Sequence, residues 1–196
     1  HVPVDVTGLA SGVSAIAAGA FHSCAVTAGG GMKCWGANDY GALGDNSTTN
    51  RLAPVDVLGL ASGVAAASAG YAHTCARTTE GSAKCWGKNE GGLLGVGDAL
   101  IRGDAPGQMG DRLPVIDLGK GRTVKVLAVG EHLSCAILDN DAVKCWGQND
   151  WGQLGLGDTQ VRGDGPGEMG AMLPPVDLGG PAIAISTGLS FTCALL

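Results

Sequence analysis

Short stretches of alternating side chains, separated by glycine-rich turns, recur along the whole chain. Residues 13–17 and 124–128 alternate small and branched side chains, with the two-residue period of a half-buried β-strand. Two more strands are predicted at His22–Val26 and Met32–Trp35, and the glycine-rich residues 28–31 between them suit a tight hairpin turn. Because no segment has the length and the 3.6-residue period of an amphipathic helix, the pattern predicts an all-β fold.

A fourth kind of strand is predicted where a proline opens a short apolar segment. Such segments lie at Pro54–Val57, Pro114–Leu118 and Pro175–Leu178. Proline has no backbone N–H to give to a ladder, so it suits the start of a strand or the edge of a sheet. Each repeating unit is therefore expected to contain four short strands.

The chain is built from one repeated unit. A Gly-x-x-x-Ser/Thr-Cys motif begins at Gly19, Gly70, Gly130 and Gly188, so successive motifs are 51, 60 and 58 residues apart. The first three copies continue with Lys-Cys-Trp-Gly and then Asn-x-x-Gly-x-Leu-Gly, at residues 33–36 and 38–44, 84–87 and 89–95, and 144–147 and 149–155. Four strands in a unit of this length are typical of a β-propeller blade, so residues 1–196 are interpreted as tandem propeller repeats.

These motifs resemble the regulator of chromosome condensation repeat. That family's pattern includes Gly-x-x-His-Ser/Thr before the second strand and Trp-Gly-x-Asn-x-x-Gly-x-Leu-Gly after the third, and the match covers essentially the whole chain. The resemblance implies a seven-bladed propeller. The long segments 97–118 and 157–178 carry Arg-Gly-Asp-x-Pro-Gly-x-Met-Gly and resemble variants in secreted bacterial proteins.

The strand count predicts an unfinished ring. The chain holds four copies of the first and second strands but three of the third, which is about three and a half blades of an expected seven. An open array of blades leaves hydrophobic blade faces bare. We therefore expect a fragment of a longer protein, and a half-ring that closes with a second copy is the alternative.

Six of the seven cysteines form three pairs with one spacing. Two residues ten positions apart would lie opposite each other in the hairpin of each unit, and opposed Cβ atoms of a non-hydrogen-bonded pair are close enough for a disulfide. Such bonds indicate an oxidising, extracellular or cell-surface compartment. The expected disulfides are Cys24–Cys34, Cys75–Cys85 and Cys135–Cys145, with Cys193 left unpaired.

Zinc is the alternative use of these cysteines. In the first two units, His22 and His73 lie two positions before a cysteine and would complete sets of three ligands. In the third unit the histidine moves to His132, on another face of the strand, and the fourth unit has Phe191 instead. A ligand set that shifts while the cysteine spacing stays fixed favours disulfides, so the histidines are expected to be structural, bonding a nearby turn.

Composition narrows the classes of partner. With 12 Lys and Arg against 18 Asp and Glu, the formal net charge is −6, and the basic residues occur singly. Nucleic acids and anionic lipids attract basic stripes or clusters, so neither partner is expected. No apolar run reaches the 18 residues of a candidate membrane span, and no signal peptide is visible.

The side chains predict a binding protein rather than an enzyme. No catalytic constellation, cofactor motif or regular metal site is recognisable. Trp35, Trp86 and Trp146 share one repeat position and are expected to pack between blades. Tyr40 and Trp151 occupy a turn position that varies between repeats, which makes both candidate contacts for a protein partner.

The long segments carry two weaker signals. Asp98, Asp104, Asp158 and Asp164 are calcium candidates, although their spacing is irregular and aspartates commonly cap turns. Residues 102–104 and 162–164 both read Arg-Gly-Asp, the integrin-recognition tripeptide. Because both copies occupy one position of a structural repeat, a structural role is favoured.

The sequence is compatible with three functions. The first is an extracellular or cell-surface scaffold that binds a protein through its loops, and the second is a subunit of a surface assembly whose open blade edges pair between chains. The third, guanine-nucleotide exchange, rests on the resemblance alone and is opposed by the acidic charge and the oxidising chemistry. The family's ultraviolet-sensing branch relies on tryptophans, where this chain has Ala20, Tyr71, Glu131 and Leu189.

Overall fold

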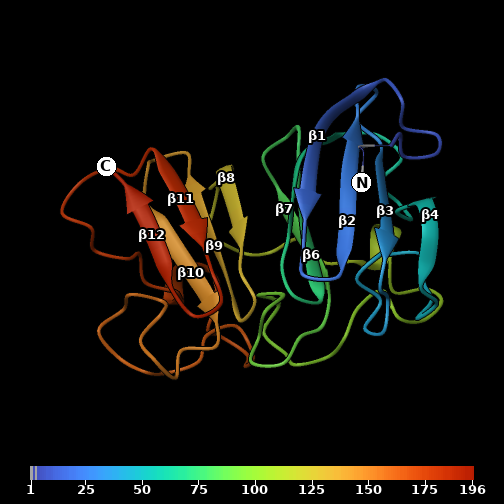
Figure 1. Ribbon diagram of the computed structural model, residues 1–196. Helices are drawn as coiled ribbons and strands as arrows, with labels where there is room; N and C mark the ends of the chain where they lie inside the picture. The colour runs from blue at the N-terminus through green and yellow to red at the C-terminus, as the bar shows by residue number, and fades with distance from the viewer. Residues whose placement is uncertain (1, 3) are drawn as a thin grey trace.

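The computed structural model describes residues 2 and 4–196, and its regular structure is almost entirely antiparallel β (Figure 1). Each repeat contributes one sheet. The first contains β1 (Val13–Ala18), β2 (His22–Thr27), β3 (Met32–Gly36) and β4 (Arg51–Asp56), in that order. The others contain β5 (Val64–Ala69), β6 (His73–Thr78) and β7 (Ala83–Gly87); β8 (Val124–Val129), β9 (Leu133–Leu138) and β10 (Val143–Gly147); and β11 (Ala184–Thr187) and β12 (Thr192–Leu195).

The four sheets are arranged as consecutive blades of a partial propeller (Figure 1). The first strand of each sheet is the innermost, because β1 contacts β5, β5 contacts β8, and β8 contacts β11. The all-β propeller predicted from the repeats is therefore confirmed. The last sheet stops after its second strand, as the repeat count indicated.

The leading glycine of each repeat lets neighbouring blades approach closely. A Cβ atom on Gly19 would meet the carbonyl oxygen of Gly70, and one on Gly70 would meet that of Gly130. The same backbone contact supports inter-blade hydrogen bonds, since the amide of Ala20 donates to Gly70 at 3.1 Å. The inner strands can pack at this distance only where the side chain is absent.

The fourth strand differs from the prediction. In the first blade, β4 begins at Arg51 rather than at Pro54, and Pro54 lies inside this edge strand near a register shift. In the described chain, no strand forms at Pro114–Leu118 or at Pro175–Leu178. What remains there is an isolated bridge between Val143 and Val176 and a hydrogen bond from Ile116 to Ala83.

Extra residues explain the lost strand. Arg102 and Arg162 pair with Gly87 and Gly147 as Arg51 pairs with Gly36. From that point the first repeat returns to its ladder within residues 52–56, whereas the others insert the longer loops 103–115 and 163–175. These loops leave the sheet and form the short 3-10 helices η1 (Gly110–Arg112) and η2 (Gly170–Met172).

Three apolar cores fill the spaces between consecutive sheets. Trp86 lies in the core between the first two blades and Trp146 in the core between the second and third, both fully buried. Their predicted packing between blades is confirmed. Trp35, at the same repeat position of the first blade, is partly exposed because no preceding blade among the described residues covers it.

Candidate functional site

Every predicted disulfide is formed. The paired cysteines lie directly opposite each other in the hairpin registers, with Cα atoms 4.1 Å apart. This spacing is typical of a non-hydrogen-bonded pair, which brings opposed Cβ atoms closest. All six sulfurs are buried and consumed by the bonds Cys24–Cys34, Cys75–Cys85 and Cys135–Cys145, so they are not zinc ligands.

Cys193 is the free cysteine of the described chain, and it is exposed. It lies on β12 opposite Ser186 of β11. The other side of β12 has no neighbouring strand within the described residues, whereas the equivalent strands of earlier blades pair there with the cysteine-bearing third strand.

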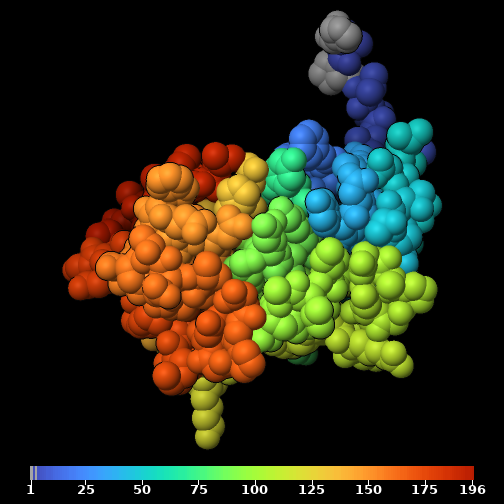
Figure 2. All heavy atoms as spheres, turned by 90° about the horizontal axis from the view of Figure 1, so that it is seen from below, coloured from blue at the N-terminus to red at the C-terminus, as the bar shows by residue number. Residues whose placement is uncertain are grey.

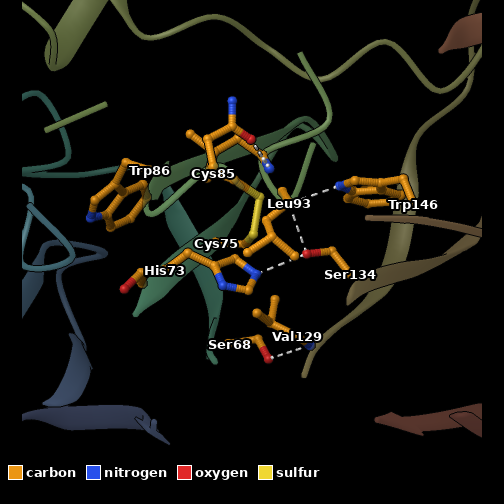
Figure 3. The surroundings of a disulfide bond; sticks show 12 residues. Ser68, His73, Cys75, Cys85, Trp86, Leu93, Val129, Ser134 and Trp146 are labelled. Atoms are coloured by element: carbon orange, nitrogen blue, oxygen red, sulfur yellow. Dashed lines mark hydrogen bonds between the residues drawn. A yellow bond between two sulfur atoms is a disulfide. The ribbon is translucent and has the colours of Figure 1, made fainter. Parts of the chain in front are cut away.

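The histidines connect neighbouring blades. Nε2 of His22 lies 2.8 Å from Oγ1 of Thr74, and Nε2 of His73 lies 3.1 Å from Oγ of Ser134 (Figure 3). Each hydroxyl donates in turn to a turn carbonyl of the histidine's own repeat. The structural role predicted for the histidines is confirmed for His22 and His73, which reach that turn through a hydroxyl of the next blade. This relay could not be predicted from the sequence, because each histidine and its hydroxyl partner are more than fifty residues apart.

The indole rings complete the same inter-blade contact. Nε1 of Trp86 donates to the carbonyl oxygen of Ala42 at 2.9 Å, and that oxygen also accepts from Thr74. Likewise Trp146 donates to Leu93 at 3.1 Å, alongside the bond from Ser134 (Figure 3). In each of the first two blades, one turn carbonyl therefore accepts hydrogen bonds from two side chains of the next blade.

Burial keeps both imidazoles neutral. Burial lowers the pKa of His22 from 6.5 to about 4. The pKa of His73 falls to about 3, chiefly through burial and further through the charges of His22, His132 and Lys88. Because Ser134 gives its single proton to Leu93, Nε2 of His73 is the donor to Ser134, and its Nδ1 is buried without a partner.

A buried asparagine fixes the turn that follows each third strand. Its Oδ1 accepts the backbone N–H of a leucine five residues on, and its Nδ2 donates to carbonyls nine residues on, all between 2.7 and 3.0 Å. These residues are Asn38, Asn89 and Asn149, and each is fully buried. Their fixed place in the repeat was the sequence signal for this role.

Two calcium candidates have a different partner. Asp98 binds Arg102 at 2.6 Å and Asp158 binds Arg162 at 2.7 Å, as Asp45 binds Arg51 in the first repeat. Burial alone would raise the pKa of Asp98, but the hydrogen bond from Arg102 leads the interactions that hold it below its ordinary value. These aspartates therefore serve as internal counter-ions of the turn.

The other two calcium candidates lie in loops held by a single side chain. Oε1 of Gln108 accepts three backbone N–H groups, from residues 103–105, and Oε2 of Glu168 accepts the three from residues 163–165. Burial and the neighbouring Glu168 raise the pKa of Asp164. The structure does not gather Asp104 or Asp164 into a ligand cage. In the described chain no group of three or more His, Cys, Asp or Glu side chains is placed to hold a metal ion.

The Arg-Gly-Asp tripeptides are part of the same internal structure. Arg102 is tied to Asp98 and also donates to the carbonyl of Leu100 at 2.7 Å, while Gly103 is buried. A Cβ atom on Gly103 would touch Trp86 and Met109, so this backbone lies against the core. The tripeptide is not presented as an exposed recognition loop.

Exposed aromatic side chains gather at one end of the blades. The connections 19–21 and 70–72 meet the turns that begin at Ala37 and Lys88 there, through hydrogen bonds from Ala37 to Phe21 and from Lys88 to Ala72. We call this the loop end; it lies at the bottom of Figure 1 and faces the viewer in Figure 2. Phe21 is 62% exposed, Tyr40 38% and Trp151 82%, so both aromatic residues predicted as partner contacts are accessible there.

The long turns and inserted loops of the second and third blades lie side by side at this end (Figure 2). Lime and orange surfaces meet along the boundary between the two blades. Within the described residues no helix has the length and hydropathy needed to cross a bilayer.

Family comparisons agree with the repeat analysis. One regulator of chromosome condensation (RCC1) repeat model matches residues 13–42 and 64–92, and a second matches residues 30–77 and 141–195, just over half of the chain. The E3 ubiquitin-protein ligase HERC2 of Homo sapiens is 34% identical over 152 residues, which cover 75% of this chain and 3% of that protein. The Ultraviolet-B receptor UVR8 of Arabidopsis thaliana is 32% identical over 158 residues, 80% of this chain and 34% of the receptor.

Solved structures show the same fold. Human WBSCR16 superposes with a TM-score of 0.75 at 21% identity, covering 97% of this chain and 46% of that one. Yeast RCC1 (Prp20), solved bound to Kap60, gives 0.73 at 18% identity, covering 93% and 41%. The chain thus spans less than half the length of these relatives. The repeat motifs, the blade architecture and the family match together establish that the chain belongs to the regulator of chromosome condensation (RCC1) repeat family.

Proposed function

We propose that this chain is part of a non-enzymatic propeller that binds another protein through its loop end, outside the reducing cytosol. The observation that carries the proposal is the exposure of Phe21, Tyr40 and Trp151 at this end. Tyr40 and Trp151 lie on turns that are held by buried hydrogen bonds to Asn38 and Asn149. Aromatic side chains on a preorganised surface lose little conformational entropy on binding and are frequent hot spots of protein interfaces.

The three disulfides support the extracellular or cell-surface part of the proposal. Each one cross-links a hairpin and is buried. Disulfides of this structural kind persist in oxidising compartments and are rare where glutathione keeps thiols reduced.

Relatives of the same fold support a protein as the class of partner. Yeast RCC1 (Prp20) was solved with Kap60, and a second structure of Prp20p was described together with its binding to Gsp1p and histones. Other relatives are ubiquitin ligases and an ultraviolet-B receptor, so membership of the family selects no single activity. The partner of this chain is therefore to be found by its contact with the loop end.

A pull-down tests this proposal. The chain, kept oxidised, is immobilised and exposed to native cell-surface and culture proteins. We expect one partner to bind saturably, and we expect Trp151→Ser to weaken that binding. Ile183→Ser is the matched control, because Ile183 is an apolar residue, 67% exposed, that directly precedes β11 and so lies at the end of the blade opposite the loop end. Failure to find a saturable partner, or equal loss in both variants, would contradict the proposal.

Self-assembly is a second candidate, favoured by the open edge of β12 and the exposed Cys193 beside it. Unpaired strand edges are templates for pairing with another chain. Light scattering after size-exclusion chromatography, with and without reductant, distinguishes the two cases. Assembly predicts a mass that rises with concentration, whereas a monomer at all concentrations would exclude it.

A further inference from the structure

A pocket of about 400 Å³ opens at the loop end between the first and second blades. Three chain connections line it: Phe21 follows β1, Tyr71 follows β5, and Asp39 and Tyr40 lie in the turn after β3. His22 and Ala42 also line the pocket, and both belong to the buried inter-blade hydrogen-bond relay. Buried hydrogen bonds therefore hold this part of the pocket wall in place.

Aromatic rings form much of its wall. The rings of Phe21 and Tyr71 meet edge to face, with centroids 5.3 Å apart and planes at 82°. The ring of Tyr40 already has a cation on it, because Nζ of Lys88 lies 5.7 Å from its centroid. Lys88 is in turn paired with Glu90 at 2.7 Å, so its charge is balanced within the molecule. Aromatic faces of this kind attract guanidinium and ammonium groups.

One acidic group in the pocket has no such balance. Asp39 is exposed, and within the described residues it has neither an ion pair nor a side-chain hydrogen bond. The residues at the same turn position of the other repeats are also acidic, Glu90 and Asp150, and the chain as a whole carries a net charge of −6. The charge of the pocket is therefore complementary to a cation.

We propose that this pocket receives an arginine side chain of the partner protein, with the guanidinium on the aromatic rings and hydrogen-bonded to Asp39. The proposal rests on the proposed function, since it names the chemistry by which the loop end recognises its partner. Arginine fits better than lysine because its planar guanidinium both stacks on aromatic faces and binds a carboxylate through two parallel hydrogen bonds.

Other guests fit the pocket less well. A leucine or phenylalanine of the partner would cover Asp39 without replacing the hydrogen bonds of water, which costs free energy. An acidic side chain would be repelled by the Asp39 carboxylate. The positive charge of Lys88 would not compensate for this repulsion, because Lys88 is already paired with Glu90. The aromatic rings and the unpaired carboxylate are jointly satisfied by a cation.

The test uses short peptides and nuclear magnetic resonance on the isotope-labelled chain. The probes are acetylated tripeptide amides with arginine, lysine or leucine between two glycines. We expect the arginine peptide to shift the ring signals of Phe21, Tyr40 and Tyr71 in a saturable way. Asp39→Asn should weaken this binding about fivefold, the upper end for an exposed ion pair. Asp150→Asn, at the equivalent turn of the third blade, should leave it unchanged.

Each other outcome overturns the proposal. Tighter binding of the lysine or leucine peptide, shifts away from these rings, or equal affinity of the Asp39→Asn variant would each remove the assignment. Asp39 is exposed and makes no hydrogen bond within the described chain, so loss of fold does not confuse the result; urea unfolding of the variant checks this. If the native partner is captured by Asp39→Asn but lost with Trp151→Ser, the proposed function stands and the arginine pocket fails.

Discussion

Nε2 of His73 lies 3.1 Å from Oγ of Ser134, which is 61 residues further along the chain and one blade away. The hydroxyl of Ser134 donates a hydrogen bond to the carbonyl of Leu93, to which Trp146 also donates (Figure 3). Two blades are thus joined by three hydrogen bonds inside a fully buried interface. In such a low-dielectric setting hydrogen bonds are strong, and a proton added to the relay is costly.

Acid is therefore expected to destabilise the blades through these histidines. Burial lowers the pKa of His22 to about 4 and that of His73 to about 3, against about 6.5 in an unfolded chain. Below about pH 6.5 the unfolded state binds more protons, so stability is complete above that pH and falls as the pH drops toward 4. Each ring contributes a slope of up to about 1.4 kcal/mol per pH unit. Urea unfolding between pH 7 and pH 5 measures it.

Histidine variants identify the source of that slope. His73→Gln removes one titrating ring, so the free energy of unfolding should vary less steeply with pH, whatever its absolute value. His132→Gln is the control, because His132 is partly exposed and lies outside the relay. An unchanged slope in His73→Gln, or an equal change in both variants, would show that other groups cause the acid sensitivity.

The indole N–H of Trp146 gives a second prediction. Trp146→Phe deletes the hydrogen bond to Leu93 and leaves a small cavity, so we expect a loss of about 1 to 2 kcal/mol in the free energy of unfolding. The carbonyl of Leu93 keeps its bond from Ser134, which limits the loss. Trp151→Phe, at a residue that is 82% exposed, should change stability by less than about 0.5 kcal/mol. Similar losses in the two variants would contradict this account of the interface.

The sequence predicted the features that repeat locally and missed those that depend on the next repeat. The first three strands and the disulfides follow from alternation, hairpin glycines and a fixed cysteine spacing, all within one unit. The relay from His22 to Thr74 joins residues of different units, so no spacing within a repeat could reveal it. The prediction of a fourth strand was wrong in the second and third repeats. There, residues 103–115 and 163–175 leave the sheet between the bridge at Arg102 or Arg162 and the next ladder contact at Ile116 or Val176.

The candidate site shows the same division. Exposure of Tyr40 and Trp151 follows from their variable turn position, since a side chain required by packing would be repeated. The aspartates of the long segments are only weak calcium candidates in the sequence, and in the structure Arg102 and Arg162 neutralise Asp98 and Asp158 from four residues away. The pocket between Phe21 and Tyr71 could not be foreseen, because the two residues occupy different positions of their repeats.

Removing one disulfide should destabilise its blade measurably. The Cys75→Ala and Cys85→Ala double variant loses a cross-link across ten residues, and the chain-entropy model gives a loss of about 2 to 3 kcal/mol. Cys193→Ala should leave stability unchanged, because that thiol is exposed and unbonded. Urea unfolding of oxidised samples compares the three proteins. A double variant as stable as the original chain would show that the disulfide adds nothing to the folded blade.

Close packing of the inner strands gives the last prediction. A Cβ atom on Gly70 would meet the backbone oxygen of Gly130 and the ring of His73, and the oxygen cannot rotate away as a side chain could. Gly70→Ala should therefore force the second and third blades apart and lose at least about 2 kcal/mol. Its backbone does not have the left-handed conformation, so the loss would report packing between blades rather than strain.

Gly29→Ala is the matched control. Gly29 lies in the first hairpin turn, also without a left-handed conformation, and a Cβ atom there meets only the Thr27 hydroxyl at 4.0 Å. The substitution should change stability by no more than about 1 kcal/mol, because the site has room for the methyl group and alanine restricts the unfolded chain. Hydrogen exchange should locate the effect of Gly70→Ala at β5 and β8. Equal stability of the two variants would mean that the leading glycines are not what lets the blades pack.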